Sequence, residues 1–150
     1  MTVNRWHTNP DSALRNSGDT IDAHQDRVAD LVSEICAQMG LDGWHVIQAA
    51  KVHDEAEREL GDMPATAKRR FPYLEEAYRR AEAEVLGEHP LDHLTDVEQS
   101  ILDLADQLDA YLWAQRFTDI RTVAWYKQLE HMREQAAQIG VAQWLRDKMG

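Results

Sequence analysis

Apolar residues recur every three or four positions over most of the chain, a spacing typical of α-helices that bury one face. The clearest stripe comprises Ile21, Val28, Leu31, Val32 and Ile35. The same periodicity predicts helices at residues 21–39, 43–60, 73–86, 96–116, 122–138 and 141–148. We find no alternation of apolar and polar residues long enough to form a strand. The pattern therefore predicts an all-α fold of about six helices.

Polar residues that can cap helices stand at the start of two of these stripes. Asp19 or Thr20 can cap the first helix and Thr95 the fourth, because their short side chains accept hydrogen bonds from free backbone N–H groups. Gly40 and Gly140 follow the first and fifth stripes, and glycine commonly stops a helix. These signals agree with the helix limits that the periodicity predicts.

The segments between the stripes contain residues that interrupt helices. Gly61 and Pro64 follow the second stripe, so the next stretch should be a loop with at most a short helix. Residues 1–18 have no sustained pattern and are expected to form a short segment around Trp6 followed by a loop. Because the connections are short, the sequence predicts a single domain over residues 1–150.

Charge and composition narrow the classes of partner. The chain has 27 acidic and 16 basic residues, a formal net charge of −11, which disfavours binding to a nucleic-acid polymer. A small anionic substrate would need a local positive field, which a divalent cation can supply. The apolar runs are far shorter than the roughly 20 residues that cross a bilayer. With Cys36 as its single cysteine, the chain is expected to be cytoplasmic and not to bind membranes.

Two histidines and one aspartate lie at positions where the helical pattern predicts buried apolar side chains. His24 follows Ile21 by three positions and precedes Val28 by four, which places an imidazole on the buried face of the first helix. Such a histidine, taken alone, is most often a core residue with its hydrogen bonds satisfied. The second stripe repeats the anomaly at His53 and Asp54. Burying an aspartate beside a histidine is costly unless both are paired or bind a ligand.

The fourth predicted helix adds carboxylates next to its apolar stripe. Asp103, Asp106 and Asp109 alternate with leucine and alanine, and at least one of them should face inward. Two imidazoles and two carboxylates would form a mixed nitrogen and oxygen site with room for water, suited to Co, Mn, Mg, Fe or Zn. Periodicity does not choose among the three aspartates.

Four short segments carry more specific information. They are RWHT at 5–8, DTIDAH at 19–24, KVHDEAERELGDMPA at 51–65 and LADQLDAY at 104–111. They resemble segments of the HD-domain phosphohydrolase superfamily, in particular bacterial 5′-deoxynucleotidases and phage dATP triphosphohydrolases. The third is the most specific, because the His-Asp pair is followed by a Glu at the third position and then by Gly-Asp-x-Pro. The resemblance covers about residues 5 to 115 and implies a compact helical HD-domain fold.

The resemblance also implies the roles of individual residues. It selects Asp106 among the three aspartates and implies one divalent metal ion held by His24, His53, Asp54 and Asp106. Asp54 and Glu57 would be catalytic, with Glu57 orienting or deprotonating the attacking water. In the substrate site, Asp62 would meet the sugar hydroxyl, Arg5 would contact phosphate or sugar, and Trp6 would pack against the sugar or base.

The reaction implied by the resemblance is attack of a metal-activated water on the α-phosphorus of a nucleotide. We expect release of phosphate from deoxynucleoside 5′-monophosphates. One alternative is a dATP or dNTP triphosphohydrolase that releases triphosphate, which would need more basic residues around the site. The other is a non-catalytic protein that keeps the HD scaffold to bind a metabolite or partner.

Several other residues have more than one interpretation. Lys68, Arg69 and Arg70 could receive phosphate, although such a charge run is usually a solvated face. His89 and His93 flank a proline that breaks helices, so we expect both at the surface. The C-terminal residues Trp125, Tyr126, Trp144 and Leu145 fit either the core or a dimer surface, with core preferred. We expect a homo-oligomer.

Overall fold

A computed structural model describes residues 3–150 and confirms the all-α prediction for that part of the chain. Nine helices are present there: five are close to the predicted segments, one covers the first half of the predicted 43–60 helix, and three have only four to six residues. They are α1 (Ser12–Arg15), α2 (Ile21–Met39), α3 (Trp44–Val52), α4 (Glu57–Leu60), α5 (Ala65–Arg70), α6 (Pro72–Leu86), α7 (Asp96–Phe117), α8 (Val123–Gln138) and α9 (Ala142–Met149).

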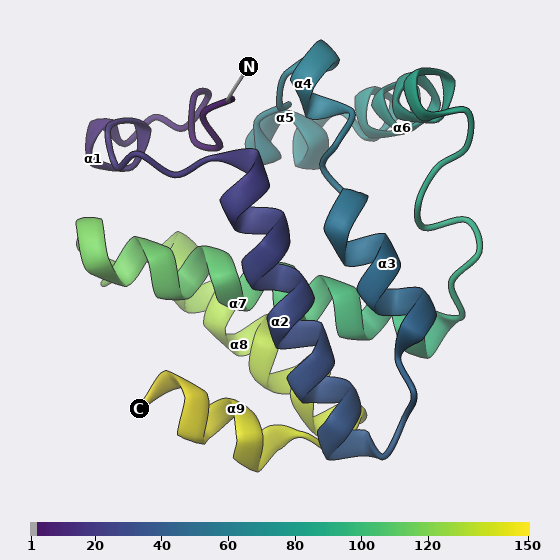
Figure 1. Ribbon diagram of the computed structural model, residues 1–150. Helices are drawn as coiled ribbons and strands as arrows, with labels where there is room; N and C mark the ends of the chain where they lie inside the picture. The colour runs from purple at the N-terminus through teal and green to yellow at the C-terminus, as the bar shows by residue number, and fades with distance from the viewer. Residues whose placement is uncertain (1–2) are drawn as a thin grey trace.

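The core lies where α2 crosses α7, with α3 beside α2 (Figure 1). Helix α7 also packs against α8, and α8 against α9. The predicted apolar stripe of α2 faces this core, and Val28, Val32 and Ile35 have no exposed surface. From α7 the core receives Ile101, Leu104 and Leu108, which are also fully buried. Burial of these side chains supplies the main driving force that holds α2, α3 and α7 together.

Two of the predicted capping threonines cap their helices. Thr20 rather than Asp19 caps α2, with its hydroxyl accepting from the N–H of Ala23 at 3.1 Å. Thr95 and Glu98 form a capping box at the start of α7, in which each side chain accepts from the backbone N–H of the other residue. Asp19 is thereby free for side-chain contacts elsewhere, and it is almost completely buried.

The predicted second helix ends earlier than its apolar stripe. It was expected to continue to residue 60, but α3 ends at Val52 and a turn separates it from α4. His53 Nδ1 lies 2.7 Å from the carbonyl of Ala50, which would otherwise accept from the N–H of Asp54. That N–H donates instead to Oε1 of Gln25 on α2, at 2.9 Å. A side-chain hydrogen bond thus replaces the helical bond of Asp54, and the chain continues in tighter backbone turns, with the N–H of Glu55 donating to the carbonyl of Val52 at 3.1 Å.

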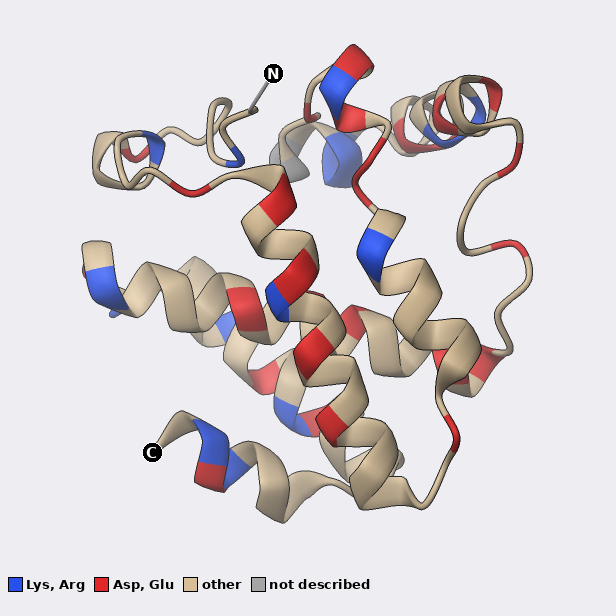
Figure 2. Ribbon diagram, in the orientation of Figure 1, with Lys and Arg blue, Asp and Glu red and all other residues tan. Residues whose placement is uncertain are grey.

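The helices outside the core are polar. Helix α6 has no buried residue and packs against α4 and α5 rather than against α7. Acidic residues form a row along the solvent face of α2, at Asp22, Asp26, Asp30 and Glu34 (Figure 2).

Within residues 3–150 no helix is both long and apolar enough to span a membrane.

The C-terminal aromatic and apolar residues are divided between core and surface. Leu145 is buried in the core, and Trp125 and Trp144 pack against it while partly exposed. Tyr126 is exposed. The preference for core is therefore confirmed for Leu145, whereas Trp125 and Trp144 lie at the edge of the core and Tyr126 lies at the surface.

Candidate metal centre

The structure brings the four predicted metal ligands together from three separate segments. His24 comes from the first turns of α2, His53 and Asp54 from the turn after α3, and Asp106 from the middle of α7. One potential ligand atom from each of the four lies within 4.8 Å of the others. This group, which we call the His/Asp cluster, could hold a metal ion.

The distances within the His/Asp cluster fit ligands of a single ion. Nε2 of His24 is 2.9 Å from Oδ1 of Asp106 and 3.1 Å from Oδ2 of Asp54. Nε2 of His53 is 3.2 Å from the same nitrogen of His24 and 3.4 Å from Oδ1 of Asp106. Metal bonds of about 2.1 Å place neighbouring ligands about 3.0 to 3.4 Å apart in octahedral or tetrahedral geometry.

Both imidazoles are oriented for metal binding through Nε2. Nδ1 of His24 lies 2.7 Å from Oδ2 of Asp109, and Nδ1 of His53 lies 2.7 Å from the carbonyl oxygen of Ala50. Since both partners accept hydrogen bonds, each Nδ1 must carry the proton. In the neutral imidazole the lone pair is then on Nε2, which faces the centre of the cluster. In this form both histidines present an unprotonated Nε2 to the same point, as two ligands of one metal ion would.

The electrostatics of the cluster also fit a cation. Burial and the nearby Arg5 lower the pKa of His24, but hydrogen bonds to Asp106, Asp109 and Asp54 outweigh them and raise it to about 9. Burial raises the pKa of Asp106, yet its hydrogen bonds with His24 and His53 bring it well below the usual value. Without a metal ion, protons on the imidazoles thus balance the negative charges of the two carboxylates. A bound metal ion would supply this positive charge instead.

Glu57 lies within electrostatic range of the cluster. It is the first residue of α4, three positions after Asp54, and its backbone N–H donates to the Asp54 carbonyl at 3.0 Å. Burial, followed by the negative charges of Asp54, Asp62 and Asp106, raises the pKa of the Glu57 carboxyl to about 9. At neutral pH this carboxyl therefore holds a proton and could act as a general acid; a cation in the cluster would lower its pKa and allow it to act as a base.

Asp62 is joined to the N-terminal turn. Its backbone N–H donates to Nε2 of His7 at 3.3 Å, and Thr8 donates to its carboxylate at 3.5 Å. His7 is itself held by a hydrogen bond from Nδ1 to the carbonyl of Asn4, at 2.8 Å. Burial, with Asp54 as a further cause, raises the pKa of Asp62. Asp62 is therefore placed by tertiary contacts and not only by its own turn.

Arg5 and Trp6 lie on the same N-terminal turn and both contact Asp19. Trp6 is nearly buried, its indole N–H donates to Asp19 at 3.2 Å, and the guanidinium of Arg5 lies 4.4 Å from its ring centre. Nη1 of Arg5 is 3.5 Å from the Asp19 carboxylate but makes no hydrogen bond within the described residues, although it is buried. A buried donor without a hydrogen bond is suited to an anionic ligand.

Two cavities adjoin these residues. One of about 230 Å³ is lined by His53, Asp54 and Asp106 together with Lys68 and Tyr78. A second, of about 470 Å³, is lined by residues from the N-terminal turn, the Asp62 loop and α8, among them Arg5, Trp6, Asp62, Arg69 and Trp125. Three of the four predicted ligands therefore line one cavity, and the predicted substrate residues line the other.

Sequence reasoning missed several polar residues around the cluster. His89 was expected at the surface but is buried, 3.3 Å from Glu82, and lines the cavity beside the cluster. Gln25, which holds the turn at Asp54, had no signal except its position one residue after His24. Of the three aspartates on α7, Asp103 is exposed while Asp109 is buried behind His24.

Comparisons with protein-family models, curated proteins and solved structures found no match to this chain. The geometry of the His/Asp cluster and the sequence segments that surround it are therefore the basis for a functional proposal.

Proposed function

We propose that this protein is a divalent-metal-dependent phosphohydrolase of small nucleotides that releases phosphate from deoxynucleoside 5′-monophosphates. The observation that carries the proposal is the His/Asp cluster, in which two imidazoles with Nδ1 already bonded present Nε2 beside two carboxylates. A divalent cation held there would lower the pKa of a water molecule and neutralise charge on the phosphoryl oxygens.

The protein's own residues would supply proton transfer and binding. Glu57 would hold the proton of the attacking water, because burial and the negative charges of Asp54, Asp62 and Asp106 raise the pKa of its partly buried carboxyl. Arg5 offers a guanidinium whose buried Nη1 makes no hydrogen bond to the residues that the structure describes. A phosphate oxygen would satisfy this group and balance its charge.

The larger cavity supports binding of the nucleoside part. Its volume of about 470 Å³ falls within the range of roughly 300 to 1,000 Å³ that small-molecule sites occupy. Asp62 in its wall can accept a hydrogen bond from a sugar hydroxyl, and Trp125 and the accessible edge of Trp6 offer apolar surface to a sugar or base.

A triphosphate substrate is the second candidate, and one observation favours it. Lys68 and Arg79 line the cavity that opens on His53 and Asp106. Two cations beside the cluster could contact the outer phosphates of a dNTP. Arg79 is 2.9 Å from Asp92 in the described structure, so it would have to exchange this partner for a phosphate.

Phosphorus NMR distinguishes these reactions from a binding protein without catalysis. The purified protein is incubated with dNMPs and dNTPs in the presence of Co²⁺, Mn²⁺ or Mg²⁺, with His53→Ala as the cluster variant. We expect orthophosphate from dNMPs, lost in the variant and after chelation. Triphosphate from dNTPs would establish the second candidate, and no turnover with any metal would exclude both.

A matched control separates loss of the cluster from loss of the fold. His131 lies on the exposed surface of α8, and its one ion pair among the described residues is with Asp103, at 3.7 Å. His131→Ala should keep full activity and metal binding. If His53→Ala and His131→Ala bind Co²⁺ equally well, the His/Asp cluster is not the metal site.

A further inference from the structure

A buried carboxylate outside the four ligands contacts one of them directly. Asp109 lies on α7 one turn after Asp106, and its side chain is 6% exposed. Its Oδ2 accepts from Nδ1 of His24 at 2.7 Å. Because a buried imidazole can rotate or change tautomer unless its second nitrogen is bonded, this contact determines which nitrogen faces the cluster.

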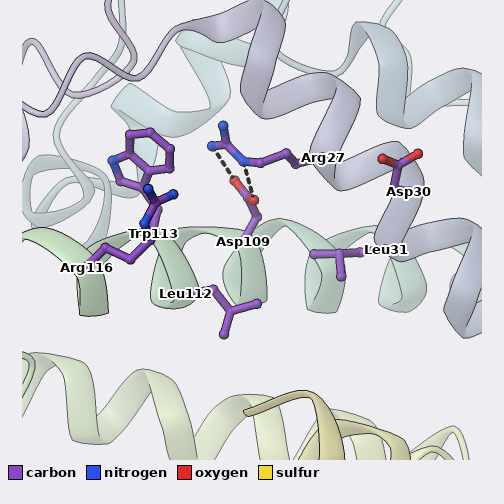
Figure 3. Close-up of a pocket in the computed structure, with 7 residues that line it drawn as sticks. All are labelled: Arg27, Asp30, Leu31, Asp109, Leu112, Trp113 and Arg116. Carbon is purple, nitrogen blue, oxygen red and sulfur yellow. Dashed lines mark hydrogen bonds and ion pairs between the residues drawn. The ribbon is translucent and has the colours of Figure 1, made fainter. Parts of the chain in front are cut away.

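Asp109 is itself held by an arginine from another helix. Arg27 on α2 donates from Nε to Oδ1 at 2.8 Å and from Nη2 to Oδ2 at 3.0 Å. Figure 3 shows these two bonds, with the guanidinium of Arg27 facing the carboxylate across the gap between α2 and α7. The ring of Trp113 lies 4.5 Å from the guanidinium carbon and limits its movement. A two-pronged contact of this kind sets both the position and the plane of the carboxylate.

The contacts continue from Arg27 to the N-terminal turn. Nη2 of Arg27 also donates to both carboxylate oxygens of Asp19, at 2.9 and 3.0 Å. Asp19 is 1% exposed and accepts from the indole N–H of Trp6 at 3.2 Å. A continuous set of polar contacts therefore joins His24 to the segment that carries Arg5 and Trp6. No residue in this set is a predicted metal ligand except His24.

We propose that Asp109 and Arg27 are positioning residues, which fix the orientation of His24 and so determine the affinity of the cluster for a divalent cation. This inference rests on the proposed metal-dependent function. Partners of metal-binding histidines commonly change metal affinity by about 10- to 100-fold when they are removed. Asp109→Asn removes the charge that Arg27 and His24 share, and its amide can present a donor to Nδ1 in place of an acceptor.

The test measures metal affinity in matched variants of the full chain. Asp103→Asn is the control, because Asp103 lies three residues before Asp106 on α7, as Asp109 lies three after, but is exposed. Affinity for Co²⁺ is measured by competition with a chelator, and folding by circular dichroism. We expect Asp109→Asn to weaken Co²⁺ binding about 10- to 100-fold and Asp103→Asn to leave it unchanged.

A second measurement detects orientation rather than general stability. In zinc-loaded protein with ¹⁵N-labelled histidine, the Nδ1 proton of His24 should be protected from exchange in the unchanged chain and in Asp103→Asn. In Asp109→Asn this proton should exchange faster with solvent, and its resonance should shift. Equal Co²⁺ affinity and an unchanged proton in both variants would overturn the positioning role while the metal site stands. Absence of metal binding by the unchanged chain would instead refute the proposed function.

Arg27→Lys covers the case in which Asp109→Asn does not fold. Lysine keeps the positive charge but cannot make the two-pronged contact with the carboxylate. We expect several-fold weaker Co²⁺ binding than in Asp103→Asn, with the His24 proton again less protected. The same affinity in both variants would overturn the proposal.

Discussion

His24 has no exposed surface, yet its two ring nitrogens face three carboxylates. A buried polar group is costly unless each of its hydrogen-bonding atoms has a partner. Asp109 satisfies Nδ1, whereas Nε2 lies at 2.9 to 3.2 Å from three other potential ligand atoms. Such crowding of ligand atoms around one point, rather than pairing, is what distinguishes this site from an ordinary buried histidine.

Glu57 offers a test of catalysis that does not depend on metal affinity. Glu57→Gln keeps the size of the side chain but cannot take up a proton, so we expect turnover to fall about 10²- to 10⁴-fold. Binding of Co²⁺ should change little, because Glu57 is outside the group of four ligand residues. Rates on the preferred nucleotide and chelator competition measure the two effects separately.

Glu59→Gln is the matched control, because Glu59 is exposed on the same short helix. It should retain both turnover and metal affinity. Equal turnover in the two variants would remove Glu57 from the proposed mechanism.

At the scale of the elements, the loop between α2 and α3 depends on close packing of backbone against side chain. Gly43 precedes α3 with φ at +66°, in the left-handed region that favours glycine. A Cβ at this position would lie 2.7 Å from Sγ of Cys36 on α2. The missing side chain therefore allows α3 to begin close to α2, which places His53 at its far end opposite His24.

Gly43→Ala should destabilise the protein, because alanine is strained at this positive φ and its Cβ would clash with Cys36. We expect a loss of about 2 to 4 kcal/mol in the free energy of unfolding, from the left-handed conformation and from overpacking against Cys36. Urea denaturation measures this loss. Cys36→Ala removes the sulfur but keeps the Cβ, which would lie 2.9 Å from the new methyl group, so Gly43→Ala should cost only about 1 kcal/mol less in that background. The same cost in both backgrounds would show that the contact with Cys36 is unimportant.

At the scale of the whole molecule, the cluster links stability to pH and to metal. The folded pKa of His24 is about 9, above its ordinary value of 6.5. Its contribution to stability is therefore complete below pH 6.5 and is lost as the pH rises through about 9. Glu57 acts in the same direction, because the folded protein keeps its proton up to about pH 9 while the unfolded chain loses it near 4.5.

The metal-free protein should consequently lose stability between pH 6.5 and 9. Urea denaturation of chelator-treated protein at both pH values measures the change. Excess Co²⁺ or Mn²⁺ should raise the thermal midpoint and reduce this dependence, since the cation replaces the protons of the cluster. Stability of the metal-free protein that rises over this range would contradict the assignment of these protons.

His131→Ala provides the control for this experiment as well. Its imidazole is exposed on α8, so its removal should leave both the pH dependence and the metal effect unchanged. His53→Ala should abolish stabilisation by the metal at every pH.

The sequence alone was sufficient for the all-α class, for five of the main helices and for the cap at Thr95, while it left Asp19 and Thr20 as alternatives for the cap of α2. It also indicated His24 as inward-facing, because Ile21 and Val28 lie on the same face of α2 and helical geometry relates the three directly. The His53-Asp54 pair was notable for the same reason. These are local properties, and the neighbouring residues along one helix are sufficient to establish them.

Periodicity left the three aspartates of α7 open, and the resemblance implied Asp106; the tertiary structure brings Asp106 into the cluster, places Asp109 behind His24 and ends α3 at Val52. Asp106 and Asp109 are one helical turn apart, so periodicity places both near the same face, and the crossing of α2 and α3 over α7 decides which atoms each one meets. The end of α3 depends on Gln25, which lies on another helix and accepts from the N–H of Asp54. Contacts between distant segments, which no local pattern contains, thus decide how the His/Asp cluster is built.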